Sequence, residues 1–124
     1  MSEKRYSKDH EWIELHGDIA TVGITNHAQE SLGDIVFVDL PDIGKIVTAK
    51  SEISVIESVK AASDIYSPAD GEIIEVNSKL VDEASLINQQ AETDGWIFKL
   101  KISNPEQLND LMNQSDYINF LKEE

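Results

Sequence analysis

One lysine stands where it could be modified. Lys60 lies in the run 57–63, between two segments typical of strands, Ile53–Glu57 and Asp64–Ser67, so we expect it at the tip of a hairpin. Its neighbours are small, and its four-carbon stem is long and flexible, so an enzyme's active site could enclose it. Acylation would neutralise the ammonium and lengthen the arm, which suits a carrier of chemical groups. By position alone, a tip lysine is more often an ordinary surface residue.

Other chemistries find little support in the residue pattern. If one strand held both His10 and His16, they would lie about 20 Å apart, too far to share a zinc ion, and His27 adds no metal-ligand spacing. The absence of cysteine excludes disulfides, thiolate zinc sites and a cysteine nucleophile. No glycine-rich phosphate loop occurs, and 24 acidic residues are too many for a catalytic pair to be picked out. A hydrolase or metalloenzyme therefore has no local site.

The elements that must position Lys60 are mostly short strands. The first hairpin joins a strand over 11–15 to one over 19–24 through a Gly-Asp turn, and a two-turn helix over 26–32 follows. Thr25 is the expected N-cap of that helix, and Gly33 is the expected residue just after its end. The apolar run over 35–40 predicts a strand buried on both faces.

Two helical segments are expected after the last strand. Asn104-Pro105 is typical of a helix start, with Gln107 as the capping-box partner of Asn104. Ser115 is the expected cap of a final helix that turns Tyr117, Phe120 and Leu121 inward. We expect one domain over 1–124, with a β core over about 6–102 and a helical tail over 104–122.

Composition and charge exclude some classes of partner. The chain has 124 residues, 40% of them hydrophobic, and a net charge of −14. Such a surface repels nucleic acids and anionic membranes, so we expect neither as a partner. No apolar run approaches a membrane span, and no secretory signal is visible. We expect a bacterial cytoplasmic protein, or a processed form in the mitochondrial matrix.

Short sequence motifs surround Lys60 and extend over most of the chain. They are DIVFVDLP at 34–41, ESVKAASDIYSP at 57–68, GEIIEVN at 71–77, HEW at 10–12, ATVGIT at 20–25, AQ at 28–29 and GW at 95–96. Together these motifs resemble the H proteins of the glycine cleavage system over about residues 6–121. The sequence departs from the pattern at Ala49-Lys50, where relatives usually place a glycine turn, and this leaves the shape of that loop open. The stretch 82–94 also lacks prolines that are common in the family.

The resemblance implies a mainly β, lipoyl-domain-like barrel-sandwich hybrid (a hammerhead) with a short helix in the N-terminal half and C-terminal helices. It implies lipoate attached to Lys60 by an amide bond, in a carrier that is not itself an enzyme. Glycine decarboxylase (the P protein) would load an aminomethyl group onto the arm, and the aminomethyltransferase (the T protein) would unload it. Dihydrolipoamide dehydrogenase (the L protein) and lipoyl or octanoyl attachment enzymes are further implied partners. A monomer is expected, because the carrier must visit several active sites.

Two acids gain roles from the same resemblance. Glu57 and Glu11 would help attachment enzymes to recognise the tip, or would hold the amine of the loaded arm in a surface cleft. Each could equally be a solvated surface acid. Two other interpretations stay open, a carrier of a different group and an unmodified β interaction module. Biotin carriers prefer methionine on both sides of the lysine, whereas Val59 and Ala61 stand here.

Overall fold

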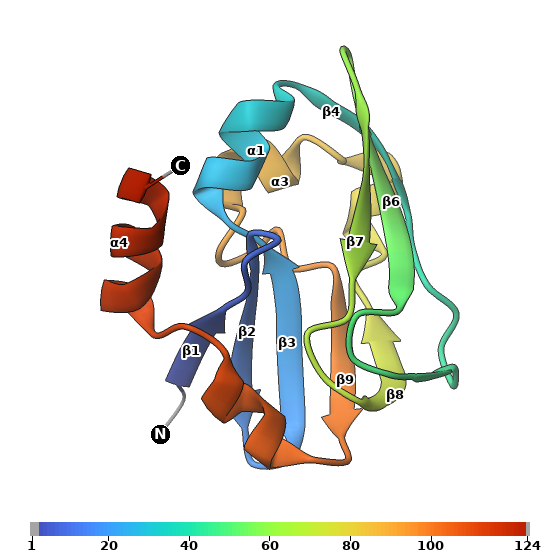
Figure 1. Ribbon diagram of the computed structural model, residues 1–124. Coiled ribbons are helices and arrows are strands. Elements are labelled where there is room, and N and C mark those ends of the chain that lie inside the picture. Colours follow the sequence, from blue (N-terminus) through green and yellow to red (C-terminus); the bar gives the residue numbers. More distant parts are fainter. Residues whose placement is uncertain (1–2, 124) are drawn as a thin grey trace.

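Two antiparallel sheets form the body of the protein in the computed structural model, which describes residues 3–123 (Figure 1). Six strands form the larger sheet, in the order β1-β2-β3-β9-β8-β5. Their bounds are β1 Glu3–Tyr6, β2 Glu11–His16, β3 Ile19–Ile24, β9 Phe98–Ile102, β8 Gly71–Val76 and β5 Ile46–Val47. The smaller sheet has the order β4-β6-β7, with β4 Ile35–Asp39, β6 Glu52–Ser58 and β7 Ala62–Tyr66. The expected mainly β fold is confirmed, although the two sheets do not close into a barrel.

Short helices surround this body. They are α1 Asn26–Leu32, α2 Lys79–Asp82, α3 Leu86–Gln90, the 3-10 helix η1 Pro105–Asp110 and α4 Gln114–Glu123. Figure 1 shows α1 beside the β6–β7 hairpin, α4 on the far side of β1, and the hairpin tip rising above the rest of the chain. The segment between β8 and β9 contains two of these helices, α2 and α3.

Apolar side chains from both sheets meet in one main core, and Tyr6, Trp12 and Tyr117 form a smaller second cluster. Ile13, Val22 and Leu100 of the larger sheet are fully buried, as is Ile56 of the smaller sheet. Leu100 and Ile56 have more exposed neighbours along their strands, which is the period-two pattern of a sheet with one buried face. Ile13 and Val22 differ, because Trp12 and Gly23 beside them are also buried. Burial of these apolar side chains is the main source of stability.

The first hairpin and the helix α1 form as expected, because local signals determine them. Gly17 has φ +65° in the β2–β3 turn. The Thr25 hydroxyl accepts a hydrogen bond from the Ala28 amide at 3.3 Å, which satisfies a free amide of the first turn. Gly33 ends the helix at φ +81°, a conformation that residues with a Cβ avoid.

The expectation that 35–40 is buried on both faces is wrong. Ile35 and Val38 are buried, but Val36 is 59% exposed and Phe37 50% exposed. A bulge between Ile35 and Phe37 shifts the register against β6, so one face of β4 points to solvent.

The tail is helical as expected, but its caps differ. The Asn104 side chain makes no capping bond, and the side-chain oxygen of Gln107 accepts a hydrogen bond from the Asp70 backbone amide at 2.8 Å. The last helix begins before Ser115, and the Asn113 side chain accepts from the Asp116 amide instead. In both places a longer-range or neighbouring partner replaces the expected one.

The loop at Ala49-Lys50 keeps the turn that a glycine would favour. Lys50 has φ +71°, and its amide donates to the Ser67 carbonyl at 2.7 Å. The Ala49 amide donates to the Asp70 carboxylate at 2.7 Å. These bonds hold a lysine in the left-handed region, where a side chain costs about 1–2 kcal/mol.

Lys50→Gly should therefore stabilise the protein. Relief of the strain exceeds the extra entropy that glycine brings to the unfolded chain, so we expect a gain of about 0.5–1 kcal/mol. Urea unfolding measures this gain. Lys50→Ala keeps the strain and serves as the control, so equal midpoints for the glycine and alanine variants would contradict the explanation.

Candidate functional site

The hairpin tip that carries Lys60 is closed by hydrogen bonds of Ser58. The Ser58 amide donates to the Ala61 carbonyl at 2.7 Å, where β6 passes into β7. The Ser58 hydroxyl accepts from the amides of Lys60 at 3.3 Å and Ala61 at 3.1 Å. Serine commonly bonds to the backbone of a tight turn in this way. The backbone of the tip is thereby fixed, while its side chains are free to project.

Lys60 is exposed at this tip, as expected. Among the described residues, no carboxylate forms an ion pair with its ammonium. Its stem passes over the end of α1, where a Cβ built on Gly33 would lie 3.4 Å from Lys60 Cε and 4.0 Å from Nζ. The absence of a side chain at Gly33 therefore leaves room for the lysine, and the amine is accessible to a modifying enzyme.

Contacts with the α1–β4 segment hold the hairpin in place. The Val59 amide donates to the Asp34 carbonyl at 2.9 Å. Asn88 of α3 supports the same segment: its side-chain amide donates to the Gly33 carbonyl, and its carbonyl accepts from the Ile35 amide, both at 2.9 Å. Sequence reasoning missed Asn88, because its partners lie more than fifty positions away.

Glu57 shares the hairpin with Lys60 but points away from the core. It is exposed and lies opposite Phe37 of β4 and Ala62 of β7 in the sheet register. Facing residues of an antiparallel pair have Cβ atoms about 5 Å apart on one face of the sheet. Glu57 therefore belongs to the outer face of the small sheet, just below the tip.

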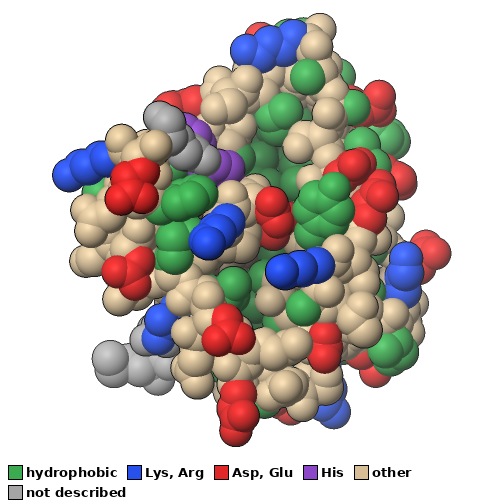
Figure 2. All heavy atoms as spheres, viewed as in Figure 1, with side chains coloured by type: hydrophobic (Ala, Val, Ile, Leu, Met, Phe, Trp, Pro, Cys, Tyr) green, Lys and Arg blue, Asp and Glu red, His purple; other side chains and the backbone are tan. Residues whose placement is uncertain are grey.

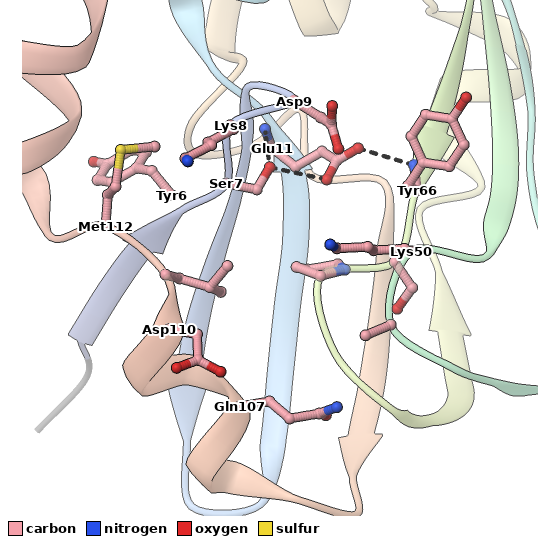
Figure 3. Close-up of a pocket in the computed structure, with 14 residues that line it drawn as sticks. Tyr6, Ser7, Lys8, Asp9, Glu11, Lys50, Tyr66, Gln107, Asp110 and Met112 are labelled. Atoms are coloured by element: carbon pink, nitrogen blue, oxygen red, sulfur yellow. Dashed lines mark hydrogen bonds between the residues drawn. The ribbon is translucent and has the colours of Figure 1, made fainter.

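Glu11, the first residue of β2, lies next to the end of β7 that is farther from the tip. It is only 2% exposed, and its carboxylate accepts hydrogen bonds from the Ser7 hydroxyl at 3.0 Å and the Tyr66 amide at 2.8 Å (Figure 3). Six residues along a strand separate Tyr66 from Lys60, or about 20 Å. The structure thus places Glu57 near Lys60 and Glu11 at a distance that only an extended arm can span.

The surroundings of Glu11 change its acidity. Burial disfavours the charged form and raises the pKa of Glu11 from 4.5 to about 7, and the negative charge of Asp9 adds to the rise. The hydrogen bonds from Tyr66 and Ser7 oppose this shift. An incoming cation would stabilise the ionised form of this buried carboxyl group, because the ion pair offsets the free-energy cost of burying its negative charge.

Two hollows lie on either side of the turn that leads into Glu11. A smaller one of about 210 Å³ lies between α1 and β7, with Asp9 at one end and apolar walls of Ile24, Ala28, Leu32 and Ile65. A larger one of about 550 Å³ opens beside η1 and includes Glu11, Lys50 and Tyr66 (Figures 2 and 3). Asp9 lines both.

Helix α4 fixes this turn from behind through Tyr117. The Tyr117 hydroxyl lies 2.8 Å from His10 Nδ1 and 2.7 Å from the Thr25 hydroxyl, and its ring stacks on Tyr6 at 4.6 Å. These contacts join the turn before Glu11 to the N-cap of α1, so both walls of the smaller hollow are held together. The inward position of Tyr117 was predicted, but its partners were not.

No three His, Asp or Glu side chains in the described part of the chain group closely enough to hold a metal ion. None of the helices within residues 3–123 has the length and apolar character needed to cross a bilayer.

A rigid β body that presents an exposed lysine on a projecting hairpin is the arrangement of a carrier protein, and the comparisons specify which. A family model described as Glycine cleavage H-protein matches residues 4–124. The glycine cleavage system H protein of Xanthobacter autotrophicus is 52% identical over 121 residues, covering 98% of this chain and 97% of that protein. The H protein of Thermotoga maritima is 50% identical over 124 residues, covering all of both chains. The chain belongs to the glycine cleavage H-protein family.

A solved structure and a plant relative extend the comparison. The crystal structure of a glycine cleavage system H protein from Mycobacterium marinum matches with a TM-score of 0.86 at 36% identity, and covers 94% of each chain. The mitochondrial H protein of Flaveria pringlei is 50% identical over 120 residues, covering 97% of this chain and 74% of that protein.

Membership of the family establishes the function of the chain. It is a lipoyl carrier that shuttles intermediates in glycine cleavage and interacts with the other components of that system. It is not a catalyst itself.

Proposed function

We propose that Lys60 is the residue that carries lipoate, through an amide bond to Nζ. The observation that supports this most is the position of the amine, which is exposed at the end of a rigid hairpin and paired with no described carboxylate. The missing side chain at Gly33 leaves room for the lysine stem. When bound, lipoate supplies a pair of sulfur atoms that accept and release the cargo.

The loaded arm is proposed to rest along the smaller hollow and to pass Asp9, which lines both hollows, so that its amine approaches Glu11 in the larger one. The apolar walls formed by Ile24, Leu32 and Ile65 suit a hydrocarbon chain, and the hollow extends from the hairpin to Asp9. An ammonium group near Glu11 would pair with a carboxylate that burial otherwise penalises. This enclosure would keep water from the cargo, which supports a holding role for Glu11.

Partners and setting follow from the family as proposals. The cargo is an aminomethyl group that passes from glycine decarboxylase to the aminomethyltransferase, and dihydrolipoamide dehydrogenase then reoxidises the arm. A chain that visits these enzymes in turn works best as a monomer with modest interfaces. We place it in the bacterial cytoplasm, or in the mitochondrial matrix for an organellar form. Glu57, on the outer face below the tip, is proposed to assist the attachment enzymes.

Peptide mapping tests the assignment of Lys60. Protein from lipoate-replete cells is digested with trypsin, which cleaves after unmodified lysine. Lipoylation of Lys60 blocks that cleavage, so we expect one modified peptide over 51–79 in place of two peptides that meet at Lys60. An added lipoyl mass on any other lysine, or an unmodified chain from such cells, would contradict the assignment.

A further inference from the structure

The outer face of the small sheet carries an apolar group next to Lys60 that the function described so far does not use. Phe37, Glu57 and Ala62 lie side by side across β4, β6 and β7, in the last row before the tip. Val38 and Ile56 in the next row point into the core, so the Phe37 row points to solvent.

Three large apolar side chains are exposed in this region. Phe37 is 50% exposed, Val36 beside it 59%, and Val59 in the tip 69%. Single exposed apolar residues are common, but here they come from two segments that converge on the modified lysine. Exposed aromatic side chains of this kind are frequent anchors in protein interfaces.

Carboxylates surround the apolar group. Asp39 and Asp64 belong to the outward row next to that of Phe37 and Glu57, and both are exposed. A hydrogen bond with Asp64 and the negative charge of Asp64 raise the pKa of the neighbouring Glu52, which indicates a local excess of negative charge. Figure 2 shows acidic and hydrophobic side chains next to one another along the right-hand border, over β4 and β6. The face fits a partner with an apolar pocket and a basic rim.

The position of this face next to the tip indicates which class of enzyme binds there. Enzymes that act on the cargo need only the far end of the arm, which its proposed resting place puts near Glu11, about 20 Å from the tip. An enzyme that acylates Lys60 must bring Nζ itself into its active site, and so must contact the rows directly below the tip.

We propose that Phe37, with Val36 and Val59, forms the docking surface for the enzyme that acylates Lys60. The inference rests on the proposed attachment at Lys60. In that step the neutral amine attacks the acyl carbon of a thioester or acyl-phosphate anhydride held by the enzyme. The amide C–N bond forms and the bond to the leaving group breaks. The leaving group keeps the electron pair, and the two protons lost from the ammonium go to it and to solvent.

The test compares Phe37→Ala with Ile46→Ala, using the unmodified full-length protein and a purified lipoyl- or octanoyl-transferring enzyme. Ile46 is 71% exposed and lies on β5 of the other sheet. Its replacement by alanine also removes exposed apolar surface, but at a site away from the tip. We expect Phe37→Ala to lower kcat/KM for acylation by about 10- to 30-fold, mainly through KM, and Ile46→Ala to leave it unchanged. Both alanines replace exposed side chains, and circular dichroism checks that the fold is kept.

A second measurement separates this surface from those of other partners. Phe37→Ala protein is lipoylated to completion by long incubation with a lipoyl-transferring enzyme and then loaded by glycine decarboxylase, and we expect a loading rate equal to that of the lipoylated unsubstituted protein. Equal acylation of both variants would overturn the proposal, as would a loading defect as large as the acylation defect. Failure of the unsubstituted protein to accept an acyl group at Lys60 would instead overturn the attachment assignment itself.

Discussion

Lys60→Arg should abolish carrier activity while leaving the fold intact. The guanidinium keeps the positive charge, but its very high pKa leaves almost no neutral nitrogen to be acylated. Because Lys60 is exposed and makes no ion pair with a described residue, its replacement by another long cationic side chain should change stability little. Glycine-dependent release of carbon dioxide in a reconstituted system should fall to the level seen without the carrier.

Lys45→Arg provides the matched control, because Lys45 is also an exposed lysine in a loop. Its activity and mass gain should equal those of the unsubstituted protein. Both arginine variants should unfold at the same urea concentration as the parent, since exposed substitutions change stability by little. Activity in the Lys60→Arg protein, or an acyl group elsewhere on it, would remove Lys60 from the function.

Glu11→Gln should stabilise the protein at high pH. The pKa of Glu11 is about 7 in the folded chain, against an ordinary value of 4.5, so the fold favours the neutral acid. This favourable term is complete below pH 4.5 and is lost as the pH rises to about 7. The glutamine variant has no such term to lose. We therefore expect it to gain about 3 kcal/mol over the parent by pH 8, and little at pH 4.

Urea unfolding of both proteins between pH 4 and pH 9 measures this difference. Glutamine can still accept from the Tyr66 amide and donate to the Ser7 hydroxyl, so the hydrogen bonds of the site are kept. A difference in stability that does not vary with pH would show that burial does not govern the ionisation of Glu11.

The same variant should hold its cargo less well. Glutamine cannot pair with an ammonium, and a charge-assisted hydrogen bond contributes about 1.5–3 kcal/mol. We expect the aminomethyl-loaded protein, kept apart from its partners, to lose its cargo to water about 10- to 100-fold faster at pH 8. An unchanged rate would limit Glu11 to a structural role. Lipoylation of Lys60 should be unaffected, because Glu11 lies about 20 Å away.

Local signals made part of this molecule predictable from its sequence. The Gly-Asp turn, the Thr25 cap and the Gly33 end act within a few residues, and each forms as expected. The hairpin with Lys60 at its tip followed from two strand-like segments around small residues. The roles of the two acids came from family resemblance, and residue spacing alone would not have selected either.

The parts that escaped prediction depend on contacts between distant segments. The pKa of Glu11 is set by its burial and by Tyr66, which lies 55 positions away. Gln107 is drawn from its own helix start to the Asp70 amide, 37 positions away. The exposed face of β4 results from a bulge, and an apolar run gives no sign of one. In each case the tertiary arrangement overrides a reasonable local pattern.

The close approach of Lys60 to Gly33 makes one small residue serve two purposes. The glycine ends α1 with a backbone conformation unsuited to other residues, and the same missing side chain gives clearance to the lysine stem. An arm attached to Lys60, as we propose, would start its motion leaning toward the helix and would therefore sample some directions more often than others. A single mutation at this hinge point would alter both the helix end and the directions the tether can sample.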